Sequence, residues 1–538
     1  MYVTAIPNRK SRATILLRES YREGKKVKSR TLANLSKWDE FKIEALKKVL
    51  SGGVEEIAEV PEIGKSFGLL YAMKEIAGEI GITKALGKSR EGLLALFLII
   101  ARIGNQGSRL SARRWSRDQA IEEVLGIEEI KENELYKALD WVEENQEEIE
   151  AELYKRYKKE KGKPPVMVLY DVTSSYFEGE KNELAEFGYN RDKKKGKKQI
   201  VIGLLTDEEG EPLAVRVFKG NRNDVSTVDE QIEVVKNRFG IEEVVFVGDK
   251  GMIKSRGKEE LNKVGLRYIT TLSKKEIESL VKKSNIQMEM FREEIREVRL
   301  EGKRYILRCN IRIRERLRKE REKRVEKIKK MVEARNNYVR DHKRAKVESG
   351  EKAIRGKLKA YRISGYIRLE VEGREIKVEI EEDKHEELYK LDGCYAIETD
   401  VREEVMSGDS IDRNYHRLSK VERDFKNMKT EMLEVRPIYL RKGNRTRGHV
   451  LITSLALRVT RRLESKLKER FGVDEKGHYR VTVEESIKEL SKISFLSYSI
   501  KDKKKNRLAK LSVLQEEILE GIRNDLAGKL SKCSQKNF

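Results

Sequence analysis

The sequence predicts an α/β protein, and three observations support this prediction. Apolar runs at residues 166–177 and 242–252 are short enough to be buried strands, and in each the apolar residues lead into an aspartate. Two further strand patterns and one helical pattern lie between them, in the order strand, strand, strand, helix, strand. Residues 40–160 have the spacing of helices instead. A sheet preceded by a helical region is therefore expected.

The composition indicates a large folded protein and weakly favours a polyanionic partner, since many basic proteins bind none. The chain has 538 residues, and 117 Lys and Arg against 93 Asp and Glu give a net charge of +24. At ~100–200 residues per domain this length predicts about three to five domains. A basic surplus favours a partner such as nucleic acid, although a charge run is also what a solvated helix face looks like.

Several classes of protein are excluded. Three scattered cysteines rule out a disulfide framework and a cysteine-based zinc module, and they suit a reducing cytoplasm. The longest apolar run, residues 93–101, is far shorter than the ~20 residues of a spanning helix, so no membrane contact is expected. No GxxxxGK[ST] motif occurs, which predicts that no nucleotide cofactor is used.

The N-terminal elements are a hairpin and a set of helices. Residues 1–40 alternate around a turn at 22–25, as in a β-hairpin, and carry many exposed Lys and Arg. A helix from residue 40 is expected to end at Gly52 and Gly53. Two helices around Gly104 and Gly107 fit a helix-turn-helix or an ordinary bundle, and the bundle is favoured.

The core elements follow Pro164 and Pro165. After the first strand, residues 199–207 and 212–221 form a hairpin, a helix ends at Gly240, and the strand at 242–252 follows. A large, highly charged insertion is predicted at 275–390, with strands, a long basic helix and paired strands. Residues 311–346 alone contain 16 basic and 6 acidic residues, a net of +10. Core character resumes near residue 392, and helices are expected at 410–429 and 447–467.

Asp171 and Asp249 each end a buried strand. A carboxylate there is costly to bury unless it is paired or bound to metal, although either residue alone fits a turn or cap as well. Neighbouring strand ends would bring both carboxylates together, and hard oxygen ligands suit Mg²⁺. Two such ions ~4 Å apart would activate an attacking oxygen and stabilise the leaving oxygen of a phosphodiester.

Glu422 is the candidate third carboxylate. Tyr415, Glu422 and Lys429 recur every seven residues, so on one helix they share a face. This spacing equally fits a packing stripe with an incidental glutamate. Asn221 and Arg222 follow a strand and are further candidates for lining the site, where a plain turn is an equal alternative.

Four segments together resemble the DDE transposases of prokaryotic insertion sequences. They are VLYDVTSSYFEG, KKQIVIGLLTDEEGEPLAVRVFKGNRND, VVFVGDKGM and YHRLSKVERDFKNMK. The resemblance covers residues 165–270 and 390–465. It is to the large group that has a Tyr-Arg-Glu-Lys signature and an insertion before the catalytic Glu.

The resemblance implies an RNase H-like catalytic core in which Asp171, Asp249 and Glu422 hold two Mg²⁺ or Mn²⁺ ions. Tyr415 and Lys429 match the signature residues that bind DNA ends. Leu418 stands in place of the signature Arg, and the adjacent Arg417 points about 100° away on a helix. Some members of the family stack a flipped base on a Trp of the insertion. Here all three Trp lie N-terminal to it, so an aromatic such as Tyr305, Tyr361 or Tyr366 would take that role.

The expected function is therefore metal-dependent DNA cleavage at element ends and strand transfer of the 3′-OH into target DNA. Tyr415, Arg417, Lys429, Asn221 and Arg222 would contact DNA. The partners would be the terminal inverted repeats and the target, bound by a homodimer in the cytoplasm, associated with the nucleoid. The alternatives are an RNase H-like nuclease or resolvase, and a non-catalytic repressor derived from a transposase.

Six regions are predicted along the chain. They are an N-terminal β-hairpin region (1–40), a helical DNA-binding domain (41–160), the first part of the core (161–274), the insertion (275–390), the second part of the core (391–470) and a helical basic C-terminal region (471–538).

Overall fold

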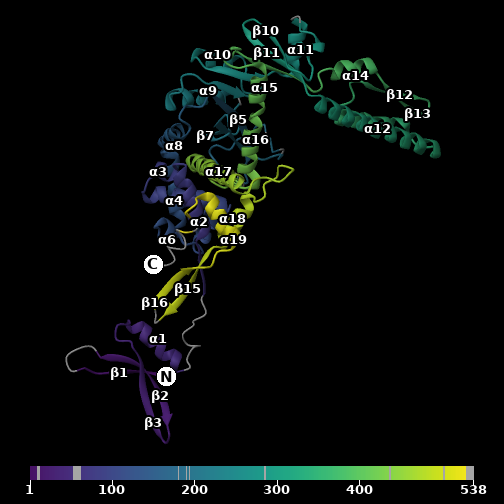
Figure 1. Cartoon of the computed structure of the whole chain (residues 1–538). Helices are drawn as coiled ribbons and strands as arrows, with labels where there is room; N and C mark the ends of the chain where they lie inside the picture. Colours follow the sequence, from purple (N-terminus) through teal and green to yellow (C-terminus); the bar gives the residue numbers. More distant parts are fainter. Residues whose placement is uncertain are drawn as a thin grey trace. The chain divides into compact units, whose positions relative to one another are not determined.

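The structure is a computed structural model of the whole chain. It describes residues 1–8, 13–51, 62–179, 181–189, 191–192, 194–223, 225–283, 286–435, 438–500, 503–526 and 528. Two compact units are present, the larger made of residues 80–86 and 137–458. The smaller contains residues 1–79, 87–136 and 459–538. Figure 1 shows the elements of both in chain order.

An eight-stranded sheet forms the centre of the larger unit. Its strands are β5 (Met167–Tyr176), β6 (Gln199–Asp207), β7 (Pro212–Lys219), β8 (Val245–Gly248), β9 (Arg267–Thr271), β10 (Arg296–Leu300), β11 (Lys303–Cys309) and β14 (Cys394–Thr399). They lie in the order β10-β11-β14-β9-β8-β5-β6-β7. The pairs β5–β8 and β8–β9 are parallel and the other pairs are antiparallel. The prediction of a mixed α/β fold is thus confirmed.

The central strands are apolar because the sheet is covered on both faces. Every residue of β6 is buried, and its bounds are those that the sequence predicted. Strands covered on two faces have continuous apolar runs rather than alternating patterns. The β6–β7 hairpin turns at Gly210, whose φ of 83° favours glycine. The Asp207 carboxylate accepts hydrogen bonds from the amides of Glu209 and Glu211 in this turn.

Helices cover the two faces of the sheet. They are α3 (Ile82–Leu86), α8 (Gln146–Lys161), α9 (Val225–Glu233) with a π-helical turn (Val234–Arg238), α10 (Ser255–Lys263), α11 (Lys274–Lys283), α15 (Gly408–His416) and α16 (Leu418–Lys426) with a π-helical turn (Asn427–Glu431); a short 3-10 turn (Met288–Met290) precedes β10. Two further helices, α7 (Glu132–Glu144) and α17 (Gly443–Phe471), have residues in both units. Helix α16 packs on β5 (Figure 1), and α15 packs on β8, β9 and β11.

One expected helix is divided. The sequence predicted a continuous helix over 410–429, but α15 ends at His416 and α16 begins at Leu418. The amide of Arg417 bonds to the carbonyl of Asn414, three residues back, which tightens the chain at this point. The guanidinium of Arg417 reaches the Glu208 carbonyl at 3.3 Å, a contact that no local pattern indicates.

The insertion lies between β11 and β14. It contains α12 (Ile311–Asp341), α13 (Val347–Tyr361), β12 (Ile367–Glu372), β13 (Glu375–Ile380) and α14 (Glu382–Tyr389). Buried residues such as Ile328, Ile354 and Tyr366 give it a core of its own. The predicted basic helix and paired strands are present. Strands β10 and β11, expected within the insertion, instead extend the main sheet, because Ile306 and Leu307 are buried opposite Ile397 and Ala396.

The smaller unit begins with a three-stranded sheet of β1 (Tyr2–Ile6), β2 (Thr14–Glu23) and β3 (Lys26–Asn34), followed by α1 (Glu40–Leu50). The predicted hairpin is β2–β3, while Gly52 and Gly53 lie outside the described residues. The unit also contains α2 (Gly68–Glu79), α4 (Arg90–Gly104), α5 (Arg109–Ser116), α6 (Ile121–Leu125), α18 (Val483–Lys492) and α19 (Val513–Ile522). A second sheet is formed by β4 (Glu62–Ser66), β15 (Ser494–Ile500) and β16 (Lys503–Leu508).

Candidate active site and nucleic-acid interface

Asp171 and Asp249 lie at neighbouring positions of the main sheet. The parallel register of β5 and β8 pairs Leu169 with Val247 and Tyr170 with Gly248. One residue further along each strand are Asp171 and Asp249. The apolar residues before them fix the two strands side by side in the buried centre, so the register itself brings the two aspartates together.

The side chain of Asp171 points to the face of the sheet covered by α16. Val168, Tyr170 and Val172 belong to the buried cluster that includes residues of α9 and α10. Because successive side chains of a strand point to opposite faces, Asp171 and Thr173 point the other way. Helix α16, which packs on β5 with Val421 and Phe425 buried, carries the exposed Glu422.

The carboxylates of Glu422 and Asp249 both influence the electrostatics of Asp171. Burial raises the pKa of Asp171 to about 7, and the carboxylates of Glu422 and Asp249 act in the same direction. The Val172 amide, which donates to Oδ1 at 2.8 Å, and the Arg191 guanidinium lower it. Asp171 thus occupies an environment that disfavours its negative charge. A bound cation would favour the charged form instead.

The donor set fits a divalent cation. Among the described residues, no group of three or more His, Cys, Asp or Glu side chains is already arranged to hold a metal ion. Burial is the main cause of the raised pKa of Asp171, and the like charges of Glu422 and Asp249 raise it further. Hard carboxylate oxygens on three separate elements are the ligands that Mg²⁺ or Mn²⁺ would take.

Tyr415 contacts the strand ends from α15. Its hydroxyl lies 2.9 Å from Oγ1 of Thr271 and donates to Oδ1 of Asp249 at 3.4 Å. Burial raises the pKa of Tyr415, and the charges of Asp249 and Glu422 raise it further. The hydroxyl therefore stays protonated and acts as a hydrogen-bond donor.

Lys429 contacts β5 from the π-helical turn that follows α16. Its ammonium donates to Oγ1 of Thr173 and forms an ion pair with Asp192 at 3.3 Å. Both charged side chains are largely buried, at 11% and 12% exposure. Tyr415, Glu422 and Lys429 thus come from three successive helical segments rather than from one helix, yet all three face the same side of the sheet.

The other predicted DNA contacts lie elsewhere in the larger unit. Arg417 forms an ion pair with Glu209 at 3.6 Å in the β6–β7 turn, and the position of the expected Arg is taken by the buried Leu418. Asn221 and Arg222 follow β7, the edge strand, and Arg222 bonds to the Ser226 carbonyl. The structure does not bring Arg417, Asn221 and Arg222 together with the carboxylates.

Helix α12 has a basic stripe that is defined by six side chains. At 100° per residue they fall within an arc of about 80° and span about 27 Å of helix. The basic stripe consists of Arg312, Arg316, Lys319, Lys323, Lys327 and Lys330, all of them exposed. Within the described part of the chain none of the six takes part in an ion pair, whereas Arg318, Arg321 and Arg324 on other faces of α12 do.

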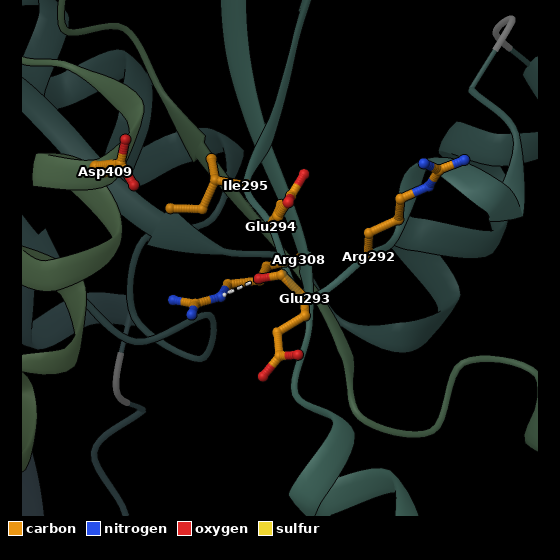
Figure 2. A pocket seen from close by; sticks show the side chains of 6 residues that line it. All are labelled: Arg292, Glu293, Glu294, Ile295, Arg308 and Asp409. Carbon is orange, nitrogen blue, oxygen red and sulfur yellow. Dashed lines mark hydrogen bonds between the residues drawn. The ribbon is translucent and has the colours of Figure 1, made fainter.

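A cavity of about 740 Å³ lies away from the carboxylates, by β11 and the start of α15. Figure 2 shows the residues that line it: Arg292, Glu293, Glu294, Ile295, Arg308 and Asp409. Arg308 donates to the Glu293 carbonyl at 2.9 Å and to the buried Asp412 at 2.6 Å. The cavity therefore borders the contacts that fix α15 to the sheet.

Sequence reasoning missed the residues that hold these elements in place. Asp412 of α15 accepts hydrogen bonds from Arg308 of β11 and from the hydroxyl of Tyr395 in β14. Thr173 and Asp192, the partners of Lys429, were also missed. A polar residue in an otherwise apolar strand, such as Thr173, is the one local signal that was available.

Comparisons with known proteins give two family matches. The model described as "IS1634 family transposase, N-terminal domain" matches residues 3–59, and the one described as "Transposase DDE domain" matches residues 162–459. No curated protein matches. The described helices include none that is long and apolar enough to span a bilayer.

Two of the solved structures that match are transposase complexes. A synaptic complex of the piggyBac transposase with hairpin DNA has 10% sequence identity and a TM-score of 0.34, over 79% of this chain and 78% of that chain. The Mos1 transposase paired-end complex with the left transposon end has 15% identity and a TM-score of 0.15, over 34% of this chain and 58% of that chain.

Proposed function

The chain belongs to the DDE transposases of insertion sequences, and we propose that this transposase cuts DNA at the ends of its own element and joins the freed 3′-OH to target DNA. We further propose that the eight-stranded sheet is an RNase H-like core. The order of antiparallel β7, β6 and β5 followed by parallel β8 and β9 supports this assignment.

The observation that supports the proposal is that separate elements place three carboxylates on one side of the sheet. Asp171 and Asp249 are set side by side by the β5–β8 register, and Glu422 comes from the helix packed on β5. These three side chains would hold the divalent cations, two Mg²⁺ or Mn²⁺ ions, which when bound supply positive charge to the oxygens of a phosphodiester.

The residues around the carboxylates have positioning roles in this proposal. Tyr415 donates to Asp249 and so fixes the direction of that carboxylate. Lys429 holds a positive charge beside Thr173, two residues from Asp171 on the same face of β5, where a DNA phosphate would approach. The basic stripe of α12 would contact the phosphate backbone of duplex DNA, which carries a high and regular negative charge.

The DNA partners are two element ends and one target. An element has two ends that must be cut and joined together, so we propose a homodimer on DNA in which each protomer acts on one end. The alternative activities can be distinguished by what happens to the DNA. A nuclease or resolvase would cut it without joining, and a repressor would bind the ends without cutting them.

The test compares Asp171→Asn with the matched control Asp383→Asn, which changes an exposed aspartate of α14. Cleavage of a duplex carrying the element end, and joining of the cut end to a plasmid, are measured with Mg²⁺ and with Mn²⁺. Asp171→Asn should abolish both products and leave end binding unchanged, while the control should be fully active. Cleavage retained by Asp171→Asn would remove Asp171 from the site and refute the proposed core.

A further inference from the structure

The β2–β3 hairpin extends beyond the sheet to which it belongs. In the described part of the chain, β1 pairs with β2 as far as Arg18, opposite Tyr2. Beyond that point, Glu19–Glu23 pair with Lys26–Arg30 alone, across a turn at Gly24. At about 3.3 Å per residue, this two-stranded ribbon projects roughly 17 Å. All residues from position 20 to position 32 are exposed.

The two faces of the ribbon differ in whether their charged side chains form ion pairs with one another. Residues directly opposite one another on antiparallel strands share a face. One face therefore carries Glu19 with Arg30, Tyr21 with Lys28, and Glu23 with Lys26. Most of its charges are paired internally: Arg30 bonds to Glu19 at 2.7 Å, Lys28 pairs with Glu23, and the Arg30 guanidinium lies 5.7 Å from the centre of the Tyr21 ring. Lys26, at the tip, is exposed.

The opposite face, which we call the hydroxyl–arginine face, has a different composition. Its opposed pairs are Arg18 with Thr31, Ser20 with Ser29, and Arg22 with Val27. It thus presents the exposed guanidinium of Arg22, the half-buried Arg18, three hydroxyls and an apolar side chain that is 67% exposed, without a carboxylate. All the acidic residues of the ribbon lie on the first face, so the positive charge of this face is available to a partner.

We propose that the hydroxyl–arginine face enters the major groove of duplex DNA and reads base edges at the element end. This inference rests on the proposed function and names the surface that selects the end. A major groove about 12 Å wide admits a two-stranded ribbon. Arginine can bond to both acceptors of a guanine, hydroxyls bond to donors or acceptors, and a side chain such as Val27 can contact a thymine methyl group.

The bulge at the root of the ribbon supports this placement. The β2–β3 register shifts between Leu17 and Arg18, where the ribbon leaves the sheet. Such a bulge bends a strand and increases its right-handed twist, and it commonly redirects the side chains beyond it. Lys25 and Lys26 at the tip are exposed and are placed to contact phosphates on either side of the groove.

The test uses the full chain and compares Arg22→Ala with Lys28→Ala. Each variant removes one exposed positive charge from the same ribbon, but from opposite faces. Binding is measured with a duplex of the element end and with a scrambled duplex at the same salt concentration. Arg22→Ala should weaken binding to the end by about 5- to 150-fold and affect the scrambled duplex far less. Lys28→Ala should change both duplexes alike.

A chemical change in the DNA gives a second, independent test. Replacing the guanines of the end by 7-deazaguanine removes the N7 acceptor from the major groove and preserves base pairing. It should weaken binding of the unmodified chain and have a smaller effect on Arg22→Ala, in which only Arg18 of this face could still bond to a guanine. Equal losses of Arg22→Ala on both duplexes, or no loss, would overturn the assignment. The proposed function would then still stand if Asp171→Asn abolishes cleavage.

Discussion

The hydroxyl of Tyr415 lies 3.4 Å from Oδ1 of Asp249, although the two residues are 166 positions apart in the chain. Asp249 follows the central strand β8, and Tyr415 comes from α15, beyond the whole insertion. The same hydroxyl lies 2.9 Å from Thr271 on β9. The hydroxyl of Tyr415 thus connects α15, in the second part of the core, to Thr271 and Asp249 at the strand ends of the first part.

Tyr415→Phe should lower the rate of cleavage about ten- to a hundredfold, because a hydrogen bond to a charged group contributes about 1.5–3 kcal/mol. The ring is kept, so the packing of α15 and the affinity for DNA should stay as they are. Single-turnover cleavage measures the effect, with the exposed Tyr439→Phe as control. An unchanged rate would show that Asp249 does not need the donor of Tyr415 beside the Lys250 amide, which bonds to the same oxygen at 2.7 Å.

Lys429→Met should lower the free energy of unfolding by about 3–5 kcal/mol, because the largely buried Asp192 loses its ion pair with Lys429. The double variant Lys429→Met with Asp192→Asn should regain most of that stability. If Lys429 also binds DNA phosphate, the double variant should still bind element ends weakly. Urea unfolding and end binding, measured on both variants, separate the two roles. Full recovery of binding would assign Lys429 a structural role alone.

Neutralising part of the basic stripe should flatten the salt dependence of DNA binding. Each phosphate contact contributes about 0.9 to the slope of log K against log salt. Replacing Arg316, Lys319 and Lys323 by Gln should therefore reduce the slope by about 2 to 3. The control replaces Lys158, Lys159 and Lys163, which are equally exposed but lie at the end of α8 and beyond it. Equal slopes for the two variants would place α12 outside the DNA path.

Asp412→Asn should make the protein less sensitive to acid. Burial by itself raises the pKa of Asp412, but hydrogen bonds from His416, Tyr395 and Arg308 hold the pKa below its ordinary value. A lowered pKa in the folded state gives stability that is present above the unfolded pKa of about 4 and is lost as the pH falls below it.

The denaturation midpoint measured from pH 5 to pH 3 checks this prediction. The unmodified chain should lose stability over that range more steeply than Asp412→Asn, which starts from a lower value because Arg308 loses a charged partner. Asp409→Asn, an exposed change on the same helix, should follow the unmodified chain. Parallel curves for all three would contradict the role given to Asp412.

The strands were accessible to sequence reasoning because their signals are local, as in the run that leads to Asp171, which is apolar over a strand length. Glu422 was proposed from its spacing from Tyr415 and Lys429 together with the family resemblance of its segment, and its role stays a prediction. The division of the helix at Arg417 was not accessible, since it accompanies contacts with Glu208 and Glu209, about 200 residues away. Pairing of β11 with β14 and the Arg308–Asp412 contact are similarly long-range, and periodicity carries no information about them.

The position of the insertion has a consequence for how such proteins change over evolution. The chain leaves the sheet at Cys309 and returns at Cys394, and these two residues are direct neighbours across antiparallel strands. A module whose two ends meet at one point of its host can lengthen, shrink or be exchanged without altering the host framework. The DNA contacts proposed for α12 can therefore change while the sheet and the carboxylates proposed for catalysis stay as they are.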